Sequence, residues 1–221
     1  NYDKGRIIAI TGTNGKTTTT ALVGQIVKAY NEQTYVVGNI GNSYTGEVLK
    51  TSENSYTVAE ISSFQLETVH RFHPVVSAIL NITPDHLNRH HTMECYAHTK
   101  ERIAENQTKD DVCVLNMEDE ELYRFGSECK ASVVWFSSKR KPDKGAYLDG
   151  DDIRYTDGTQ DKLMLNIHDM NLLGTHNYEN VCAAIAMTKA VGIPDDIIIE
   201  QVKCFKAVEH RIEYVATKKG V

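Results

Sequence analysis

The chain has 221 residues, enough to bury a sizeable core in one large domain or two small ones. Apolar residues make up 41% of the chain and charged residues 24%, values of an ordinary soluble globular protein that exclude a disordered, collagen-like or solenoid chain. The formal net charge is -6 and the basic residues form no stripe, so we expect no nucleic acid partner.

The N-terminal half of the sequence predicts strands that alternate with helices. Residues 6–11 form a β-branched run, and the sequence GTNGKTT follows it. Apolar residues then recur at helical spacing at Leu22, Val23, Ile26, Val27 and Tyr30. Further short apolar runs lie at 34–37, 56–61, 75–80, 112–115 and 132–136. This alternation predicts βαβ units and an α/β fold with a mostly parallel sheet flanked by helices.

The pattern changes between residues 145 and 166. The short segments AYL, IRY and KLMLN are separated by Asp-Gly dipeptides at 149 and 157, which suit turns with positive φ. We therefore expect a small antiparallel addition to the sheet. Helices are predicted at 177–191, closed by Gly192 and Pro194, and at 195–205, before a last strand at 211–217.

The cysteines and the chain ends suggest a piece of a cytoplasmic protein. The five cysteines, at 95, 113, 129, 182 and 204, never stand at CxxC spacing, so we expect reduced, partly buried thiols. No apolar run approaches the roughly 20 residues of a membrane span, and no signal-peptide layout is present, so we expect no membrane partner. Because the chain starts at Asn1 without Met, we interpret it as part of a longer protein.

The glycine loop is the strongest functional signal. It reads Gly12-Thr13-Asn14-Gly15-Lys16-Thr17, and a standard Walker loop would have a further glycine where Ile10 stands. The glycines let backbone N–H groups turn inward, Lys16 can reach the outer phosphates, and Thr17 can place its hydroxyl on magnesium. The strand before the loop and the helix after it favour phosphate binding over a chance GKT turn.

Three further positions are candidates for a catalytic or metal-binding role. Glu60 ends an apolar strand, where a carboxylate suits magnesium, and the phosphate loop upstream favours this role over that of an ordinary surface carboxylate. His86 follows a second strand, a place where a turn histidine is common. Lys100 stands beside Glu101 and Arg102, and local physics predicts a solvated helix lysine, since an ammonium cannot ligate a cation.

Polar residues near the end of the chain suggest a base-binding surface. Asn177 and Asn180 share a helix face and could hydrogen-bond an adenine edge, with helix capping as the alternative for Asn177.

His90 and His91 lie near His86, but without further ligands at suitable spacing we expect a solvated loop rather than a zinc site.

Several motifs together resemble the Mur ligase superfamily of ATP-dependent amide ligases. They are TGTNGKTTT at 11–19, GNIG at 38–41, AEISSFQLE at 59–67, LNITPDHLNRH at 80–90, YAHTKERI at 96–103, GTHNYENVCAA at 174–184 and EHRIEYV at 209–215. The SSFQLE form is most similar to the branch that adds D-glutamate to UDP-N-acetylmuramoyl-L-alanine. The resemblance covers residues 1–221 as the central ATP-binding domain, and implies that an N-terminal UDP-binding domain and a C-terminal amino-acid-binding domain are absent.

The resemblance also implies cofactors and site residues. ATP and Mg2+ are the implied cofactors, the substrates are small molecules, and we expect a monomer. Nucleotide binding is implied for Gly12, Thr13, Asn14, Gly15, Lys16, Thr17, Thr18, Asn177, Asn180, His210 and Arg211, and substrate binding for Asn39, Ser62 and Gln65. Catalysis is implied for Lys16, His86 and Lys100, and metal binding for Thr17, Glu60, His86 and Lys100, the last as a CO2-derived carbamate.

Three alternatives stay open at this point. Another Mur ligase or a folylpolyglutamate synthetase-like ligase would share the same central domain. A stand-alone P-loop kinase or NTPase would usually carry the longer GxxxxGK loop and an arginine-rich lid, which the short loop and the SSFQLE block disfavour. A binding module without catalysis fits if the reaction needs the other domains, and we expect the chain alone to be inactive as a ligase.

Overall fold

One sheet of nine strands organises the part of the chain that the structure describes, in the order β2-β3-β1-β4-β5-β6-β7-β8-β9. The structure is a computed structural model and describes residues 2–39 and 41–206. The strands are β1 (Arg6–Thr11), β2 (Thr34–Gly38), β3 (Tyr56–Glu60), β4 (Val76–Ile79), β5 (Val112–Asn116), β6 (Ser132–Ser137), β7 (Gly145–Asp149), β8 (Asp152–Thr156) and β9 (Asp161–Asn166). All pairings from β2 to β7 are parallel, and β8 and β9 continue the sheet antiparallel.

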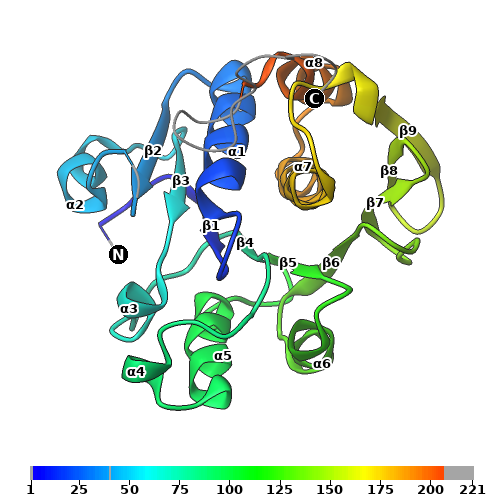
Figure 1. Ribbon diagram of the computed structural model, residues 1–221. Coiled ribbons are helices and arrows are strands. Elements are labelled where there is room, and N and C mark those ends of the chain that lie inside the picture. Colours follow the sequence, from blue (N-terminus) through cyan, green and yellow to red (C-terminus); the bar gives the residue numbers. More distant parts are fainter. Residues whose placement is uncertain (1, 40, 207–221) are drawn as a thin grey trace, which may run out of the picture.

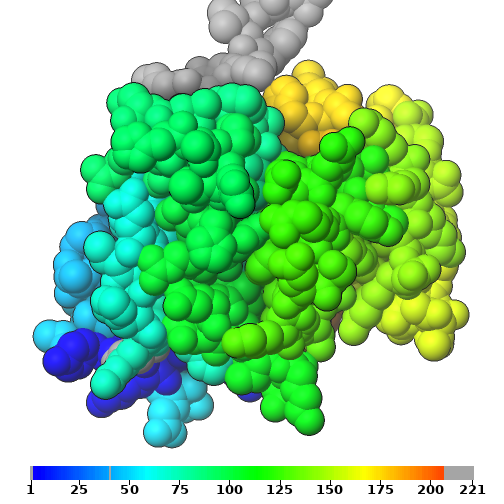
Figure 2. Space-filling view, turned by 90° about the horizontal axis from the view of Figure 1, so that it is seen from below, coloured from blue at the N-terminus to red at the C-terminus, as the bar shows by residue number. Residues whose placement is uncertain are grey.

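Helices cover both faces of the sheet, as Figure 1 shows. The first layer contains α1 (Lys16–Tyr30), α7 (Thr175–Ala190) and α8 (Asp195–Cys204). The second contains α3 (Ser63–Leu66), α5 (Met93–Glu101) and α6 (Glu120–Glu128), with α4 (Leu87–His90) beside α5. The helix α2 (Tyr44–Glu47) and the 3-10 turns η1 (Val48–Lys50), η2 (Arg102–Ala104) and η3 (Ile167–Asp169) complete the described elements. Figure 2 looks onto the second layer, where the cyan to green segments cover the sheet.

The interior strand β1 shows why helices cover both faces of the sheet. Ile8 and Ile10 belong to the apolar cluster with α1 and α7, whereas Ile7 and Ala9 belong to the cluster on the opposite face. A parallel strand that is buried on both faces reads as a continuous apolar run, which is the pattern of β1. The sheet curves around α7 (Figure 1), and residues 180–188 of this helix are all buried, as expected for a helix enclosed on several sides.

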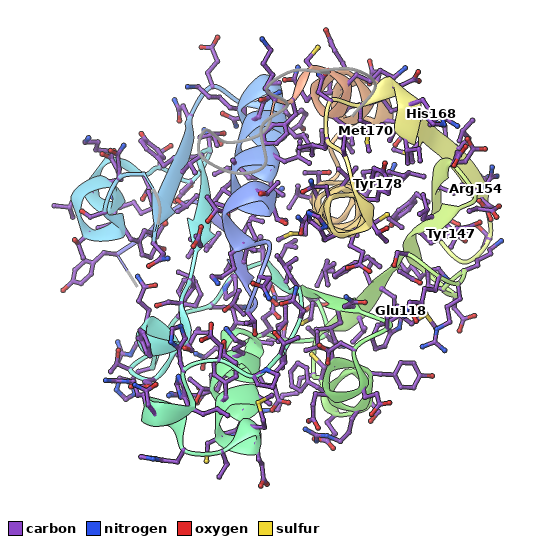
Figure 3. All side chains as sticks on the ribbon, in the orientation of Figure 1. Glu118, Tyr147, Arg154, His168, Met170 and Tyr178 are labelled. Carbon is purple, nitrogen blue, oxygen red and sulfur yellow. The ribbon has the colours of Figure 1, made fainter. Side chains whose placement is uncertain are left out.

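Side-chain contacts to Asp161 on β9 add to the backbone pairing of the antiparallel addition. Arg154 Nε donates to Asp161 Oδ1 at 2.9 Å, and Tyr147 donates its hydroxyl to Asp161 Oδ2 at 2.5 Å (Figure 3). Gly150 and Gly158 have φ of 60° and 97°, so both Asp-Gly dipeptides form turns with positive φ.

The fold confirms the predicted α/β class and the small antiparallel addition. Each of the six strands predicted before residue 137 is present, with ends that differ by no more than one residue. The helices predicted at 177–191 and 195–205 are α7 and α8, and the strand predicted at 211–217 lies outside the described residues. All five cysteines are free thiols, as expected. In residues 2–39 and 41–206, no helix combines the length and the apolar composition needed to span a bilayer.

Candidate active site

The glycine loop connects the carboxyl end of β1 to the start of α1. Gly15 is the N-cap of α1 with a φ of 82°, and a Cβ built on it would lie 2.3 Å from Asn180 Oδ1, so both the conformation and the space require glycine. Lys16 donates from Nζ to the carbonyl oxygens of Gly12 and Thr13, each at 2.9 Å. The first turn of α1 contains no acidic residue, so the positive end of this helix is not neutralised there and suits an anion.

The loop is fixed by the segment that follows β4. Thr13 N donates to Asn81 O at 3.0 Å, and Asn14 N donates to Asn81 Oδ1 at 2.8 Å. The Thr13 hydroxyl lies 3.3 Å from the Tyr96 hydroxyl and donates to Thr83 O at 3.2 Å. Sequence reasoning did not single out Asn81 or Tyr96. For Asn81 the signal was its place directly after an apolar strand.

Glu60 ends β3 beside the loop and is 1% exposed. Its Oε1 accepts a hydrogen bond from Asn39 Nδ2 at 3.0 Å, and its Oε2 is buried without a hydrogen-bond partner among the described residues. The interpretation of Glu60 as an ordinary surface carboxylate is therefore wrong. A buried carboxylate oxygen of this kind calls for a cation or a donor.

Lys100 lies inside the molecule, so the local prediction of a solvated helix lysine is wrong. Its side chain is among the fully buried ones at 1% exposure, because α5 packs against the glycine loop. Lys100 Nζ donates to Gly12 O at 2.8 Å and lies 4.6 Å from the centre of the Tyr96 ring. Burial first, and the charge of Lys16 second, lower the pKa of Lys100 from 10.5 to about 7, and Asp85 partly opposes them.

The histidines after β4 differ from one another. His86 is exposed, has a left-handed φ of 52° and is the N-cap of α4, with its Nε2 3.5 Å from an Asp85 carboxylate oxygen. His90 is 6% exposed, and its Nε2 lies 3.0 Å from Ser63 Oγ, so the expected solvated loop is wrong for this residue. His91 is exposed, as expected.

Ser62 and Gln65, expected to bind substrate, form a capping box at the start of α3. Ser62 Oγ accepts from Gln65 N at 3.3 Å, and Gln65 Oε1 accepts from Ser62 N at 2.8 Å. The pair lies directly after Glu60 and so faces the same edge of the sheet. Asn39, expected in the same role, is exposed and bonded to Glu60.

A cavity of about 360 Å³ opens on the other side of the loop. It is lined by Asn14, Gly15, Leu80, Asn81, Phe136, His176, Glu179 and Asn180. The apolar side chains of Leu80 and Phe136, together with three amide side chains, suit a planar base. Asn177 is not among the lining residues and is not the N-cap of α7, a position that Gly174 occupies. Its Nδ2 donates to Leu173 O at 2.7 Å, and its Oδ1 accepts a hydrogen bond from Asn180 Nδ2 at 3.5 Å. His210 and Arg211 lie outside the described residues.

Together the parallel sheet and the glycine loop define an α/β P-loop domain. Residues 10–188 match the Mur ligase middle domain, and the chain belongs to this family.

The chain shows high sequence identity to individual proteins over part of their length. The chain is 84% identical over 221 residues to a UDP-N-acetylmuramoylalanine--D-glutamate ligase of Lachnospira eligens, and 53% identical to the ligase of the same name from Lachnoclostridium phytofermentans. Each match covers 100% of this chain but 49% of the other protein. The chain therefore spans about half the length of the curated relatives it matches.

Solved structures share the fold at lower identity. MurF from Acinetobacter baumannii matches with a TM-score of 0.73 and 19% identity, over 98% of this chain and 49% of that one. A UDP-N-acetylmuramoyl-L-alanyl-D-glutamate--2,6-diaminopimelate ligase matches with a TM-score of 0.74 and 21% identity, over 97% and 49%. At these identities the likeness shows the fold.

Proposed function

We propose that residues 1–221 are the central ATP-binding domain of a ligase that adds D-glutamate to UDP-N-acetylmuramoyl-L-alanine. The observation that carries the proposal is the meeting of Lys16 and buried Lys100 on the Gly12 carbonyl of the phosphate loop. The choice of D-glutamate is supported by the 84% identity to a ligase with that name. In this proposal a UDP-binding domain precedes the chain and an amino-acid-binding domain follows it in the longer protein.

The reaction would proceed in two steps. A carboxylate oxygen of the muramoyl-L-alanine substrate attacks the γ-phosphorus of ATP, the bond to the β-phosphate oxygen breaks, and ADP leaves. The amine of D-glutamate then attacks the carbonyl carbon of the acyl phosphate, loses a proton and expels phosphate through a tetrahedral intermediate. Both partners of the first step are anions, so positive charge at the loop is the main requirement.

The nucleotide would lie across the glycine loop. The backbone of residues 12–18 and the start of α1 would hold the phosphates, with Lys16 released from its loop carbonyls to reach the outer ones. The cavity beside Asn180 would receive the base, and Asn177 would orient Asn180 through their contact. His210 and Arg211 would complete the nucleotide site.

The residues at the rim fit a divalent cation. The orphaned Oε2 of Glu60 is a hard oxygen ligand, which Mg2+ prefers. Thr17 and His86 would supply further ligands. When bound, Mg2+ would neutralise negative charge between the substrate carboxylate and the transferring phosphate.

Lys100 would contribute as a carbamate. At a pKa of about 7 a large share of the amine is neutral near neutral pH. The neutral nitrogen attacks the carbon of CO2 and loses a proton, which converts a cation into an anionic oxygen donor. Burial beside Lys16 supports this proposal because it removes the main obstacle, which is protonation of the amine.

Mass spectrometry of the product tests the proposed function. The full-length protein is incubated with ATP, Mg2+, UDP-N-acetylmuramoyl-L-alanine and one amino acid: D-glutamate, L-glutamate or a diamino acid. We expect the mass of one glutamate less one water to be added with D-glutamate alone, with equal amounts of ADP and phosphate. Ligation of a different amino acid, or ATP turnover without ligation, would contradict the proposal. The 221-residue chain, tested in parallel, is expected to give no ligation product.

A further inference from the structure

The short helix α4 holds His86 in a conformation that its own sequence does not favour. His86, at the N-cap, has φ 52° and ψ 27°, and His91, at the C-cap, has a φ of 67°. Left-handed conformations are disfavoured for residues other than glycine, and a helix of one turn is not stable alone. The arrangement therefore persists because tertiary contacts hold it.

Those contacts join α4 to α3, which lies close to it in Figure 1. His90 Nε2 lies 3.0 Å from Ser63 Oγ, in a buried hydrogen bond. Arg89 forms a bidentate pair with Glu67, with Nε to Oε1 at 2.9 Å and Nη2 to Oε2 at 2.6 Å. Bidentate pairs fix orientation as well as distance.

An aromatic contact fills the space between the two polar links. The Phe64 ring stacks on the His90 ring at 5.8 Å with an interplanar angle of 8°, and its centre lies 5.0 Å from that of His86. The Arg89 guanidinium lies 5.0 Å from the same ring. Phe64 thus contacts three residues of one turn, including the one whose backbone is strained.

The two helices follow different strands of the sheet. Helix α3 follows β3, which ends at Glu60, and helix α4 follows β4. Ser63, the first residue of α3, comes three positions after Glu60, and the capping box of α3 fixes that connection. His86 starts α4, because Arg89 N and His90 N both donate to His86 O, at 2.9 and 3.0 Å. A link between α3 and α4 therefore relates Glu60 to His86.

We infer that Ser63, Glu67, Arg89 and His90 form a clamp, the α3–α4 clamp, which sets the position of His86 relative to Glu60. Arg89 and His90 are then positioning residues, since they act on the cation through His86. The inference rests on the proposed function, because Glu60 and His86 are ligands in that proposal. Groups that orient metal ligands typically change metal affinity or activity by about 10- to 100-fold when they are removed.

A charge swap in the full-length protein tests the clamp. The variants are Arg89→Glu, Glu67→Arg and the double swap, and electron paramagnetic resonance measures the Kd of Mn2+ in the presence of a non-hydrolysable ATP analogue. We expect each single variant to raise this Kd about tenfold and to lower kcat without changing the KM for ATP. The double swap is expected to return the Kd to within about threefold of wild type, because the ion pair is restored with reversed polarity.

A matched pair elsewhere provides the control. Lys203 on α8 and Asp169 on η3 form an exposed ion pair at 2.9 Å that also links two elements, and swapping them is expected to leave the Mn2+ Kd and kcat unchanged. Wild-type values in Arg89→Glu would overturn the inference. Single variants that lose Mn2+ affinity without recovery in the double swap would also overturn it, since the two side chains would then act separately.

The buried link is tested by His90→Phe, which keeps a ring against Phe64 and Tyr96 and removes the hydrogen bond to Ser63. We expect a Mn2+ Kd about tenfold higher and faster amide hydrogen exchange at 86–91, with an unfolding temperature lowered by only a few degrees because Ser63 Oγ loses its partner. Unchanged Kd and exchange would refute the role of His90. If the wild-type protein binds Mn2+ and nucleotide but does not ligate D-glutamate, the proposed function fails, while the Mn2+ titrations still decide on the clamp.

Discussion

The buried lysine on α5 should make the stability of the chain depend on pH. The pKa of Lys100 is about 7 in the folded chain, against 10.5 for an ordinary lysine. Between these values the unfolded chain binds a proton that the folded chain does not, so the free energy of unfolding rises with pH. Below pH 7 both states are protonated, and the folded chain carries the full cost of a buried ammonium.

The size of the effect follows from the two pKa values. Each unit of pKa corresponds to about 1.4 kcal/mol, so the difference between about 7 and 10.5 amounts to about 5 kcal/mol over the whole range. Between pH 6 and pH 9 about 2–3 kcal/mol of this is expected to appear. The variant Lys100→Met, similar in length and without a charge, removes this dependence.

Urea unfolding followed by circular dichroism measures the effect. Wild type and Lys100→Met are compared at pH 6, 7, 8 and 9 in CO2-free buffer, and taking the difference cancels the other titrating groups. The free energy of unfolding of wild type relative to the variant is expected to rise by about 2–3 kcal/mol across this range. A difference that is flat or falls with pH would show that the Lys100 ammonium is solvated. Added bicarbonate at pH 8.5 is expected to stabilise wild type alone, because the proposed carbamate would form on the neutral Lys100 amine of the folded chain.

Three further predictions concern the loop and the strand end beside it. Lys16→Ala in the full-length protein is expected to abolish ligation and leave the unfolding temperature unchanged, and near-normal turnover would exclude Lys16 from the reaction. Glu60→Gln keeps the shape and removes the anion, so the Kd of Mg2+ measured by calorimetry is expected to rise at least tenfold; a wild-type Kd would dismiss Glu60 as a ligand. Gly15→Ala places a Cβ 2.3 Å from Asn180 Oδ1 at a φ of 82°, so chemical unfolding is expected to show a loss of about 1–3 kcal/mol, and wild-type stability would contradict the strain argument.

Local patterns in the sequence predicted the fold because its elements are defined locally. Strand β1 and the helix α1 follow from an apolar run, a glycine loop and helical spacing, none of which depends on distant residues. The two Asp-Gly turns likewise need only their own residues. The phosphate loop was recognisable for the same reason.

The environment of Lys100 was not predictable in this way, because its partner Gly12 lies 88 residues away in the sequence. The sequence nevertheless contained a weaker signal for the burial of Lys100. Lys100 comes four residues after Tyr96, so the two share a face of α5, and Tyr96, Ala97 and Lys100 are its buried residues. The burial of His90 depends in the same way on Ser63, 27 residues away.

The charges around the loop explain why these residues resist prediction from local physics. Lys16 and Lys100 share one carbonyl oxygen, although their mutual repulsion lowers the pKa of Lys100. Glu60 buries a carboxylate oxygen that finds no donor within residues 2–39 and 41–206. Each arrangement costs stability, and a fold selected for stability alone would avoid both. In the proposed function an anionic phosphate supplies the counter-charge for the lysines and a cation supplies the partner of Glu60. The unfavourable charges of Lys16, Lys100 and Glu60 are thus the ones that the proposed ligands would neutralise.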